Sequence, residues 1–447
     1  MPNLPSLLGI AQAYILTRQR QRLTGGAIEA LQRRGLLAHP RLARQVAAAV
    51  ARNEPLQALL DGLPQSDPAT LRRDFQSLNR LGLSLPEARA RALAEKEGRS
   101  TGEHGYSLGL STGSEGEPGV FITSPAERAR YVGTLLAKLL APGEMLGRRI
   151  ALLLKHDNRL YRDASRSRAL ALSYYDISAP LDSWVARLVG ERPDIVIGPP
   201  SILLAVAGSP AFASQPLRPR LLITGAEPTF PADARRLEAA YGIGPRPIYQ
   251  ACEGFIALAC PFGTLHVNDD NLIVEWRHFR CDDAYAAPVI TDFSRLTQDV
   301  RRVLLPDVVR LRRSACPCGS VFQTMEAVEG RFSDVLYAPS QTGSERRFVF
   351  PFTLDAQIQE AMPESGEWQI EQDGADSLAI LTTQALTVPQ RRDLADRLFA
   401  AGGWTRLRWE RFPTRPAEVK RRRFIRRIDP ESQEIHGALG PPCLTCR

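Results

Sequence analysis

The chain has 447 residues, of which 44% are hydrophobic and 24% charged, and its formal net charge is +8. This length is too great for one compact core and predicts two or more domains. The composition is typical of a soluble globular protein, and seven cysteines in so long a chain exclude a disulfide scaffold. The basic balance comes without any nucleic-acid-binding motif, so we expect no nucleic-acid partner.

The N-terminal segment combines an uncharged stretch, residues 2–17, with an Arg- and Leu-rich stretch, residues 18–42. The uncharged stretch contains two prolines and is shorter than the roughly 20 residues of a membrane-spanning helix, so we expect no stable membrane insertion. The second stretch predicts amphipathic helices. We expect residues 1–100 to form a helical part that docks on the main domain, with loose membrane association as the alternative. No signal peptide is recognisable, which predicts a cytoplasmic protein with reduced cysteines.

A glycine-rich segment, residues 111–119 (Ser-Thr-Gly-Ser-Glu-Gly-Glu-Pro-Gly), follows the strand-like run Tyr106–Leu110. Glycine allows backbone conformations that other residues resist, and successive amide N–H groups can then turn inward, beside hydroxyl groups, to bind an anion. The segment predicts a phosphate-binding loop, although it lacks the Gly-x4-Gly-Lys-Ser/Thr pattern of a Walker loop. A Ser/Gly-rich surface turn is the alternative.

Short apolar runs alternate with helical segments between residues 149 and 292. Such alternation predicts an α/β domain with a substantially parallel sheet, in which ligands bind at the carboxyl ends of the strands. The glycine-rich segment and the turn Gly225–Pro228 both follow strand-like runs, so we expect them to share one crevice. The predicted strands are Ile150–Leu154, Ile195–Ile197, Leu221–Ile223 and Val289–Ile290, and the predicted helices are Ser201–Ala207 and Ala232–Tyr241, the latter beginning after Pro231 and ending at Gly242.

After Gly330 the segments become shorter and more polar, which predicts a smaller second domain from about residue 336. A basic run, Lys420–Arg423, lies within this domain. From Gly437 onward the chain contains Gly-Pro-Pro and predicts a loose tail, in which we expect the pair Cys443 and Cys446 to have no role. A thiol switch or one half of a second metal site is the alternative for this pair.

The order and spacing of these motifs resemble those of the adenylate-forming superfamily of acyl- and aryl-CoA synthetases. More narrowly, they resemble the branch of phenylacetate–coenzyme A ligases and their capsule-associated and deazaflavin-adenylating relatives. The resemblance runs from about Ser107 to Arg423. It implies an α/β fold with a large N-terminal adenylate-forming domain of mixed sheets and helices, residues 1–335, and a small, mobile α+β C-terminal lid domain, residues 336–447.

The resemblance also implies roles for the residues that match the motifs of the family. Glu253, in the segment Tyr249–Glu253, would hold magnesium against the phosphates, and Tyr249 would pack on the adenine. Asp307 would accept hydrogen bonds from both ribose hydroxyls, and Arg331, at the hinge Gly330–Asp334, would grip the nucleotide. The implied ATP-binding residues also include Ser111, Thr112, Gly113, Ser114 and Gly116 in the phosphate loop, and Gly225, Ala226, Glu227 and Pro228 on the adenine side.

Several positions depart from the family pattern. Glu115 and Glu117 place carboxylates beside the expected triphosphate, which repel it unless a cation intervenes. Gly119 stands where a basic residue often follows the proline, and Gln250 and Cys252 replace the usual glycine and threonine.

Lys420 is the candidate for the mobile catalytic lysine of the family. A compact cation can stabilise the charge that builds between a substrate carboxylate and the α-phosphate. The alternative is that Lys420 belongs to a solvated basic run. Lysine is scarce in this chain, which otherwise uses arginine, and this scarcity favours the catalytic role.

Three cysteines and one histidine form a candidate zinc site. Cys316 and Cys318 lie in a Cys-Pro-Cys-Gly turn, and Cys260 and His266 are separated by five residues. Three thiolates and one imidazole suit tetrahedral structural zinc, and the resemblance favours the same set. Such a site would tie the strand after Glu253 to the segment after Asp307. The alternative is a reduced cysteine pair in a turn, beside small buried side chains.

We therefore expect an AMP-forming ligase that uses ATP and magnesium to adenylate a small carboxylic acid, with release of pyrophosphate. The branch resemblance implies an aromatic or otherwise flat acid, and an acceptor that is coenzyme A, a carrier-protein thiol or an amine. Two alternatives remain open at this stage. One is a non-catalytic descendant that binds a nucleotide or a partner protein, and the other is an enzyme that adenylates a different oxyanion.

Overall fold

The computed structural model describes residues 4–96, 99, 105–110, 118–144, 147–155, 170–339, 347–362, 367–412 and 422–444. One 13-stranded sheet runs through the larger part of the molecule, in the order β21-β10-β11-β13-β14-β9-β8-β7-β6-β5-β3-β4, with β12 beside β11. Its first half in the sequence is parallel and comprises β3 (Arg148–Leu154), β4 (Leu170–Asp176), β5 (Ile195–Gly198), β6 (Leu221–Thr224) and β7 (Arg246–Ala251).

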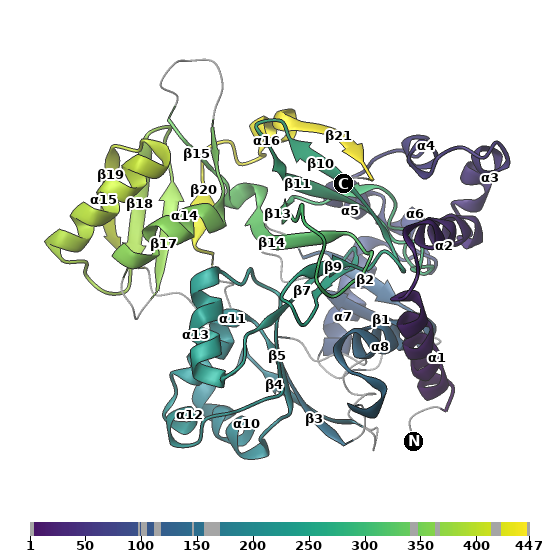
Figure 1. The fold of residues 1–447 in the computed structure, drawn as a ribbon, viewed down its shortest axis with the longest axis horizontal. Helices are drawn as coiled ribbons and strands as arrows, with labels where there is room; N and C mark the ends of the chain where they lie inside the picture. Colours follow the sequence, from purple (N-terminus) through teal and green to yellow (C-terminus); the bar gives the residue numbers. More distant parts are fainter. Residues whose placement is uncertain are drawn as a thin grey trace.

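The second half of this sheet is antiparallel. It comprises β8 (Gly254–Ala259), β9 (Leu265–Val267), β10 (Ile273–Phe279), β11 (Asp282–Thr291), β12 (Val303–Leu304), β13 (Asp307–Leu311), β14 (Thr324–Arg331) and β21 (Leu439–Cys443). Figure 1 shows how the two halves meet near β7.

Helices cover both faces of the parallel half, so its strands are apolar on both sides. Ala151 and Leu153 of β3 face one layer of helices, and Ile150 and Leu152 face the opposite side, where α8 (Pro125–Leu139) lies. The first layer consists of α10 (Val185–Glu191), α11 (Pro200–Ala207), α12 (Pro210–Ser214) and α13 (Pro231–Tyr241), together with the 3-10 turn η3 (Leu181–Ser183).

The predicted parallel strands and both predicted helices are confirmed to within a few residues. Pro231 occupies the first turn of α13, and Gly242 ends that helix in the left-handed conformation at φ +76°. Val289–Ile290 also lies in a strand, but this strand is β11 of the antiparallel half. The sequence analysis did not identify β4, in which three apolar residues precede a more polar Ser-Tyr-Tyr-Asp segment.

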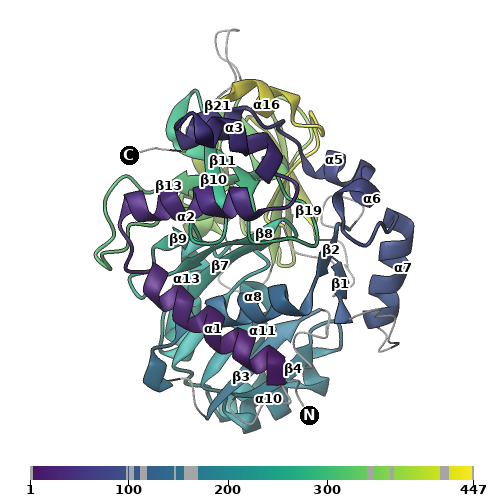
Figure 2. The same ribbon diagram turned by 90° about the vertical axis from the view of Figure 1, so that its right-hand side faces the viewer.

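The N-terminal part is helical, as expected. Its long first helix, α1, lies against α8, as Figure 2 shows. The Tyr14 hydroxyl donates to the Leu140 carbonyl over 3.0 Å, and a Cβ on Gly133 would lie 2.5 Å from the Ile10 carbonyl oxygen, so the helices touch closely. The uncharged stretch therefore docks on the main domain. The elements are α1 (Leu4–Arg20), α2 (Gly25–Ala38), α3 (Ala43–Ala51), α4 (Leu56–Asp61), α5 (Pro68–Arg73), α6 (Phe75–Leu78), α7 (Leu85–Lys96) and the hairpin β1 (Ser107–Leu110) and β2 (Val120–Thr123).

Among the helices that the structure describes, none combines the length and hydropathy that a bilayer crossing requires.

A second sheet of four strands forms the small domain, on the left of Figure 1. Trp404, Ile370 and Leu394 are buried in the core between this sheet and two helices. The observed architecture confirms the expected fold class, a large α/β domain followed by a small α+β domain. The small domain contains β17 (Trp368–Gln372), β18 (Ser377–Thr382), β19 (Arg406–Arg411), β20 (Phe424–Arg426), α14 (Pro351–Ile358) and α15 (Val388–Gly402), and the ribbon β15 (Leu336–Tyr337) and β16 (Phe348–Val349) precedes them.

The C-terminal segment returns to the large domain instead of forming the loose tail that the sequence analysis expects. After α16 (Gln433–Ala438), strand β21 pairs antiparallel with β10 at the edge of the large sheet. Ile435 and Leu439 are almost fully buried there, and Arg277 of β10 donates to the Gly440 carbonyl over 2.8 Å. Prolines are tolerated on an edge strand, so Gly-Pro-Pro did not prevent strand formation.

Replacement of Leu439 by alanine should therefore destabilise the whole protein, because it removes a buried side chain that belongs to one hydrophobic cluster with Phe279 of β10 and Ile435 of α16. The expected loss is about 2–5 kcal/mol of unfolding free energy, measured by urea denaturation. Leu93→Ala, at an exposed position on α7, is the matched control. If the two variants unfold alike, β21 does not dock in solution.

Candidate functional site

A cavity of about 1050 Å³ lies where the parallel strands end and where the small domain meets the large one. Its lining includes Gly225–Pro228 after β6, Tyr249 on β7, Glu253, Asp307 at the start of β13 and Arg331 at the end of β14. The sequence analysis selected all of these residues from separate motifs. The fold therefore brings every described member of the predicted nucleotide site to a single cavity.

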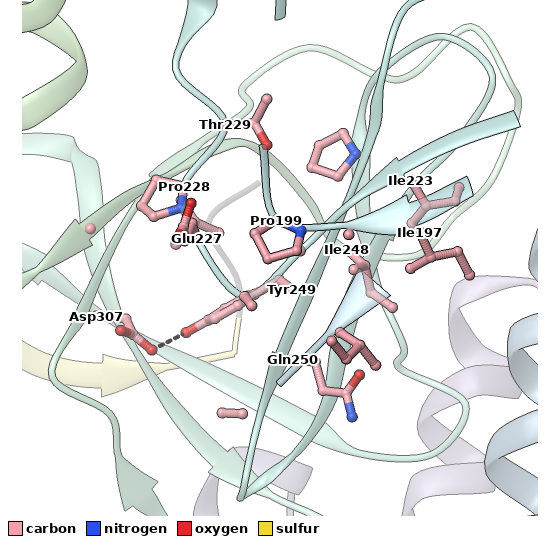
Figure 3. A pocket seen from close by; sticks show the side chains of 18 of the residues that line it. Ile197, Pro199, Ile223, Glu227, Pro228, Thr229, Ile248, Tyr249, Gln250 and Asp307 are labelled. Carbon is pink, nitrogen blue, oxygen red and sulfur yellow. Dashed lines mark hydrogen bonds between the residues drawn. The ribbon is translucent and has the colours of Figure 1, made fainter. Parts of the chain in front are cut away.

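The turn after β6 has a backbone shape that its sequence explains. Ala226 adopts the left-handed conformation at φ +65°. A Cβ on Gly225 would lie 2.6 Å from Cγ2 of Ile248 on the neighbouring strand, so only glycine fits without rearrangement. The Gly225 amide donates to the Gly198 carbonyl over 3.2 Å, which anchors the turn to the end of β5. The turn thus presents Glu227 and Pro228 to the cavity (Figure 3).

Tyr249 and Asp307 are joined by the central hydrogen bond of the site. The Tyr249 hydroxyl donates to Oδ2 of Asp307 over 2.6 Å, as the dashed line in Figure 3 shows. Burial raises the pKa of Tyr249 well above its usual value, and the nearby Asp307 charge acts in the same direction. Nε of Arg331 lies 3.9 Å from Oδ1 of the same carboxylate. Asp307 is therefore held in position from β7 and from β14 at once.

Glu253 lies in the turn between β7 and β8. Burial raises the pKa of this carboxyl group, the Asp307 charge adds to the rise, and the Arg295 and Arg331 charges oppose it. A buried carboxylate with a raised pKa gains stability when a cation approaches, and a hard cation such as Mg²⁺ prefers oxygen ligands. The pair Glu253 and Asp307 therefore fits a magnesium–nucleotide complex.

The two residues that replace the usual ones in this motif both have partners. The Tyr131 hydroxyl donates to Oε1 of Gln250 over 2.9 Å, and the Arg295 guanidinium donates to the Cys252 carbonyl. These contacts connect the motif to α8 and to the loop after β11 without closing the cavity.

Two arginines at the domain junction also line the cavity, and the sequence analysis gave them no role. The Arg423 guanidinium binds Asp233 of α13 and Asp355 of α14, each over 2.7 Å. Arg422 donates to the Ser333 hydroxyl over 2.8 Å and to Asp334. Arg423 therefore links the large and small domains directly. The dense basic run around it was the signal that could have identified both residues.

Six predicted site residues lie outside the described part of the chain. These are Ser111, Thr112, Gly113, Ser114 and Gly116 of the phosphate loop, and the candidate lysine, Lys420. Gly119, which follows the phosphate loop in the sequence, and Arg422, which follows Lys420, are described and line the cavity. The roles of these six residues stay predictions.

The four candidate zinc ligands do come together. The ligand atoms of Cys260, His266, Cys316 and Cys318 all lie within 4.8 Å of one another. The sulfur atoms of Cys260 and Cys316 are 3.6 Å apart, and Nε2 of His266 lies 3.3 Å from the Cys318 sulfur.

Their surroundings suit a metal. Burial lowers the pKa of His266 to about 4, so the imidazole is neutral at physiological pH, as metal ligation requires. The cluster joins the β8–β9 turn to the loop between β13 and β14, which is where the sequence analysis expected the link. A donor set of three sulfur atoms and one nitrogen atom at this spacing fits zinc, which prefers four such ligands.

Comparisons with known proteins give no match to any family model and none among curated proteins. Solved structures do match. The postadenylation state of 2-Hydroxyisobutyryl-CoA Ligase, in complex with 2-HIB-AMP, has a TM-score of 0.64 at 17% identity, covering 92% of this chain and 91% of that chain. The same ligase in an open conformation with 2-HIB-AMP and CoA has a TM-score of 0.54 at 18% identity, covering 90% and 91%.

In its thioesterification state with 2-HIB-AMP and CoA, the same ligase has a TM-score of 0.51 at 18% identity, covering 92% of each chain. Identities this low establish the architecture alone. The chain has the fold of the adenylate-forming acyl-CoA ligases.

Proposed function

We propose that this protein is an AMP-forming ligase that activates a carboxylic acid with ATP and then passes the acyl group to an acceptor. The observation that carries the proposal is the meeting of Tyr249, Glu253, Asp307 and Arg331 with the turn Gly225–Pro228 around one cavity. These residues come from four motifs spread over more than a hundred positions. Each of them has the chemistry that one part of an ATP molecule requires.

In the first half-reaction, an oxygen of the substrate carboxylate attacks the α-phosphorus of ATP. The bond from that phosphorus to the oxygen bridging the β-phosphorus breaks, and pyrophosphate leaves. Asp307 accepts hydrogen bonds from the ribose, and the Tyr249 ring packs on the adenine. Glu253 would hold Mg²⁺, which offsets the charge of the triphosphate. Lys420 would stabilise the charge that develops at the α-phosphate.

In the second half-reaction, an acceptor attacks the acyl carbonyl carbon and AMP leaves. We propose a thiol acceptor, coenzyme A or a carrier protein, with an amine as the alternative. The fold supports the coenzyme, because the matched ligase was solved with both 2-HIB-AMP and CoA. Membership of the phenylacetate–coenzyme A ligase branch is part of this proposal and rests on the motifs alone.

The proposal is tested by pyrophosphate release from ATP and Mg²⁺ in the presence of a panel of aryl and aliphatic acids. Acid-dependent release, with AMP appearing once coenzyme A is added, would support it. Nucleotide binding without release for any acid would instead favour a non-catalytic binder or a different oxyanion substrate.

Asp307→Asn should weaken ATP binding about tenfold or more, because the amide removes a charged acceptor that the ribose hydroxyls would use. The measurement is isothermal titration with ATP and Mg²⁺. Asp283→Asn is the matched control, since Asp283 is exposed and forms an ion pair with the exposed residue Arg313. Equal dissociation constants for the two variants would contradict the ribose role of Asp307.

We also propose structural zinc at Cys260, His266, Cys316 and Cys318. The geometry of the four ligand atoms supports it. None of the four residues lines the cavity, which favours a structural role over a catalytic one.

A further inference from the structure

The cavity extends well beyond the space that a nucleotide needs. Besides the site residues, it is lined by the inner face of α8 and by one face of the parallel sheet. We call this extension the aliphatic branch, bounded by Leu135, Leu136 and Leu139 of α8 and by residues of β3 to β6. At about 1050 Å³ the whole cavity exceeds the ~300–1,000 Å³ typical of small-molecule sites.

Strand β3 shows how far the branch reaches. Ile150, Leu152 and Leu154 alternate along the strand, so all three point to the α8 side, and all three line the cavity. From Leu154 to Ile150 the strand rises about 13 Å. The branch therefore follows the sheet from the carboxyl ends of the strands, where the nucleotide site lies, almost to their other ends.

The chemistry of the branch is uniform. Ile195 and Ile197 of β5, Ile223 of β6 and Leu172 of β4 complete the wall that faces α8. Apart from Gly198, every described residue that strands β3 to β6 contribute to the cavity is aliphatic. In Figure 3, Ile197 and Ile223 lie on the opposite side of Tyr249 from Asp307. The branch thus lies across Tyr249 from Asp307, the residue that we propose binds the ribose.

Protein interiors are packed as densely as organic crystals, so a long aliphatic void that opens into a polar site calls for a ligand of matching shape. Ile150 and Leu139 are almost fully buried and pack in one cluster at the far end of the branch, and a single aromatic ring at the mouth would not reach them. An unbranched alkyl chain would fill the space between α8 and the sheet.

We propose that the acid activated by this protein carries a medium to long alkyl chain, which occupies the aliphatic branch. This inference rests on the proposed function and differs from the expectation of a small, flat acid, which the branch resemblance implies. Each methylene buried in such a branch is expected to tighten binding about three- to fourfold.

The experiment uses hydrolysis-resistant acyl-adenylate analogues, the acylsulfamoyl adenosines, from acetyl to hexadecanoyl, with benzoyl as the aromatic member. Their dissociation constants are measured by titration on the full chain, without turnover. We expect affinity to rise with each methylene until the branch is full, and we expect the benzoyl compound to bind like a short acyl compound.

Two variants test where the chain lies. Leu135 of α8 and Leu172 of β4 are both half-buried, and both line the cavity. A larger side chain at either position, in Leu135→Trp or Leu172→Trp, should therefore fill the branch. Each should lower the ratio of long-chain to acetyl affinity at least tenfold. Leu93→Trp, at an exposed leucine on α7, controls for the substitution itself, and thermal unfolding controls for folding.

The possible outcomes distinguish the proposal of an alkyl chain from the proposal of an adenylating function. Affinity that does not depend on chain length, or tightest binding of the benzoyl compound, would overturn the alkyl chain and leave the adenylating function standing. Failure of every analogue to bind, the acetyl compound included, would overturn both. An unchanged affinity ratio in both tryptophan variants would show that the chain lies elsewhere.

Discussion

Replacing Lys420 by alanine is expected to lower acid-dependent pyrophosphate release by about 10²–10³-fold, the usual cost of removing one group that stabilises transition-state charge. The lysine is expected to act on the charge that forms as the carboxylate attacks phosphorus, so kcat should fall more than the affinity for ATP. The measurement is a steady-state pyrophosphate assay with saturating ATP and acid, beside a separate titration of ATP binding.

The neighbouring residues provide the controls. Arg421→Ala removes a charge from the same basic run without touching the candidate lysine, and should leave most of the activity. Lys420→Arg keeps the charge but replaces a compact ammonium by a planar fork, and should recover little. If Lys420→Ala and Arg421→Ala reduce the rate alike, the run acts as a solvated basic segment and Lys420 has no special role.

Loss of the cysteine cluster is expected to have the largest effect on stability. Cys318→Ser removes one of four ligands whose atoms lie within 4.8 Å, so the bound metal should be lost and the loop between β13 and β14 released. Because metal bound only by the folded state adds directly to stability, Tm should fall by about 5–10 °C. Metal content per chain by mass spectrometry and thermal unfolding report the two effects separately.

Cys281→Ser is the matched control, because Cys281 is exposed and is not among the clustered ligands. Pyrophosphate release at low temperature should survive in Cys318→Ser, since the cluster is expected to be structural. Two results together would contradict the zinc assignment. The protein would contain no metal after purification from zinc-supplemented cells, and Cys318→Ser would have the same Tm as Cys281→Ser.

The described nucleotide-site residues could be predicted from sequence because their signals are local. Tyr249 and Glu253 lie within five residues of each other. Gly225 lies in a tight turn, where a Cβ would come too close to the Ile248 side chain. Their partners Asp307 and Arg331 were recognisable from motif order. The hydrogen bond between Tyr249 and Asp307, across 58 positions, is a product of sheet topology and could not be predicted.

The aliphatic branch could not be predicted for a different reason. Ile150, Leu152 and Leu154 have the same pattern as a strand packed in a filled core, because alternation records only which face is apolar. Whether α8 packs tightly on that face or leaves a space depends on distances between elements far apart in the sequence. The interdomain role of Arg423 was hidden in the same way, since the two carboxylates that it binds lie on α13 and α14.

The pairing of β21 with β10 changes how the domains are defined. The small domain is not a terminal appendage but an insertion into the large one, because the chain leaves the large sheet after β14 and rejoins it at β21. A fragment ending near residue 335 would lack the edge strand and leave one side of β10 without a neighbour, although β11 still pairs with the other side, so it is not a valid isolated large domain. The chain connects the small domain to the large one twice, once after β14 and once before β21. The small domain can therefore turn freely only about an axis that passes close to both connections.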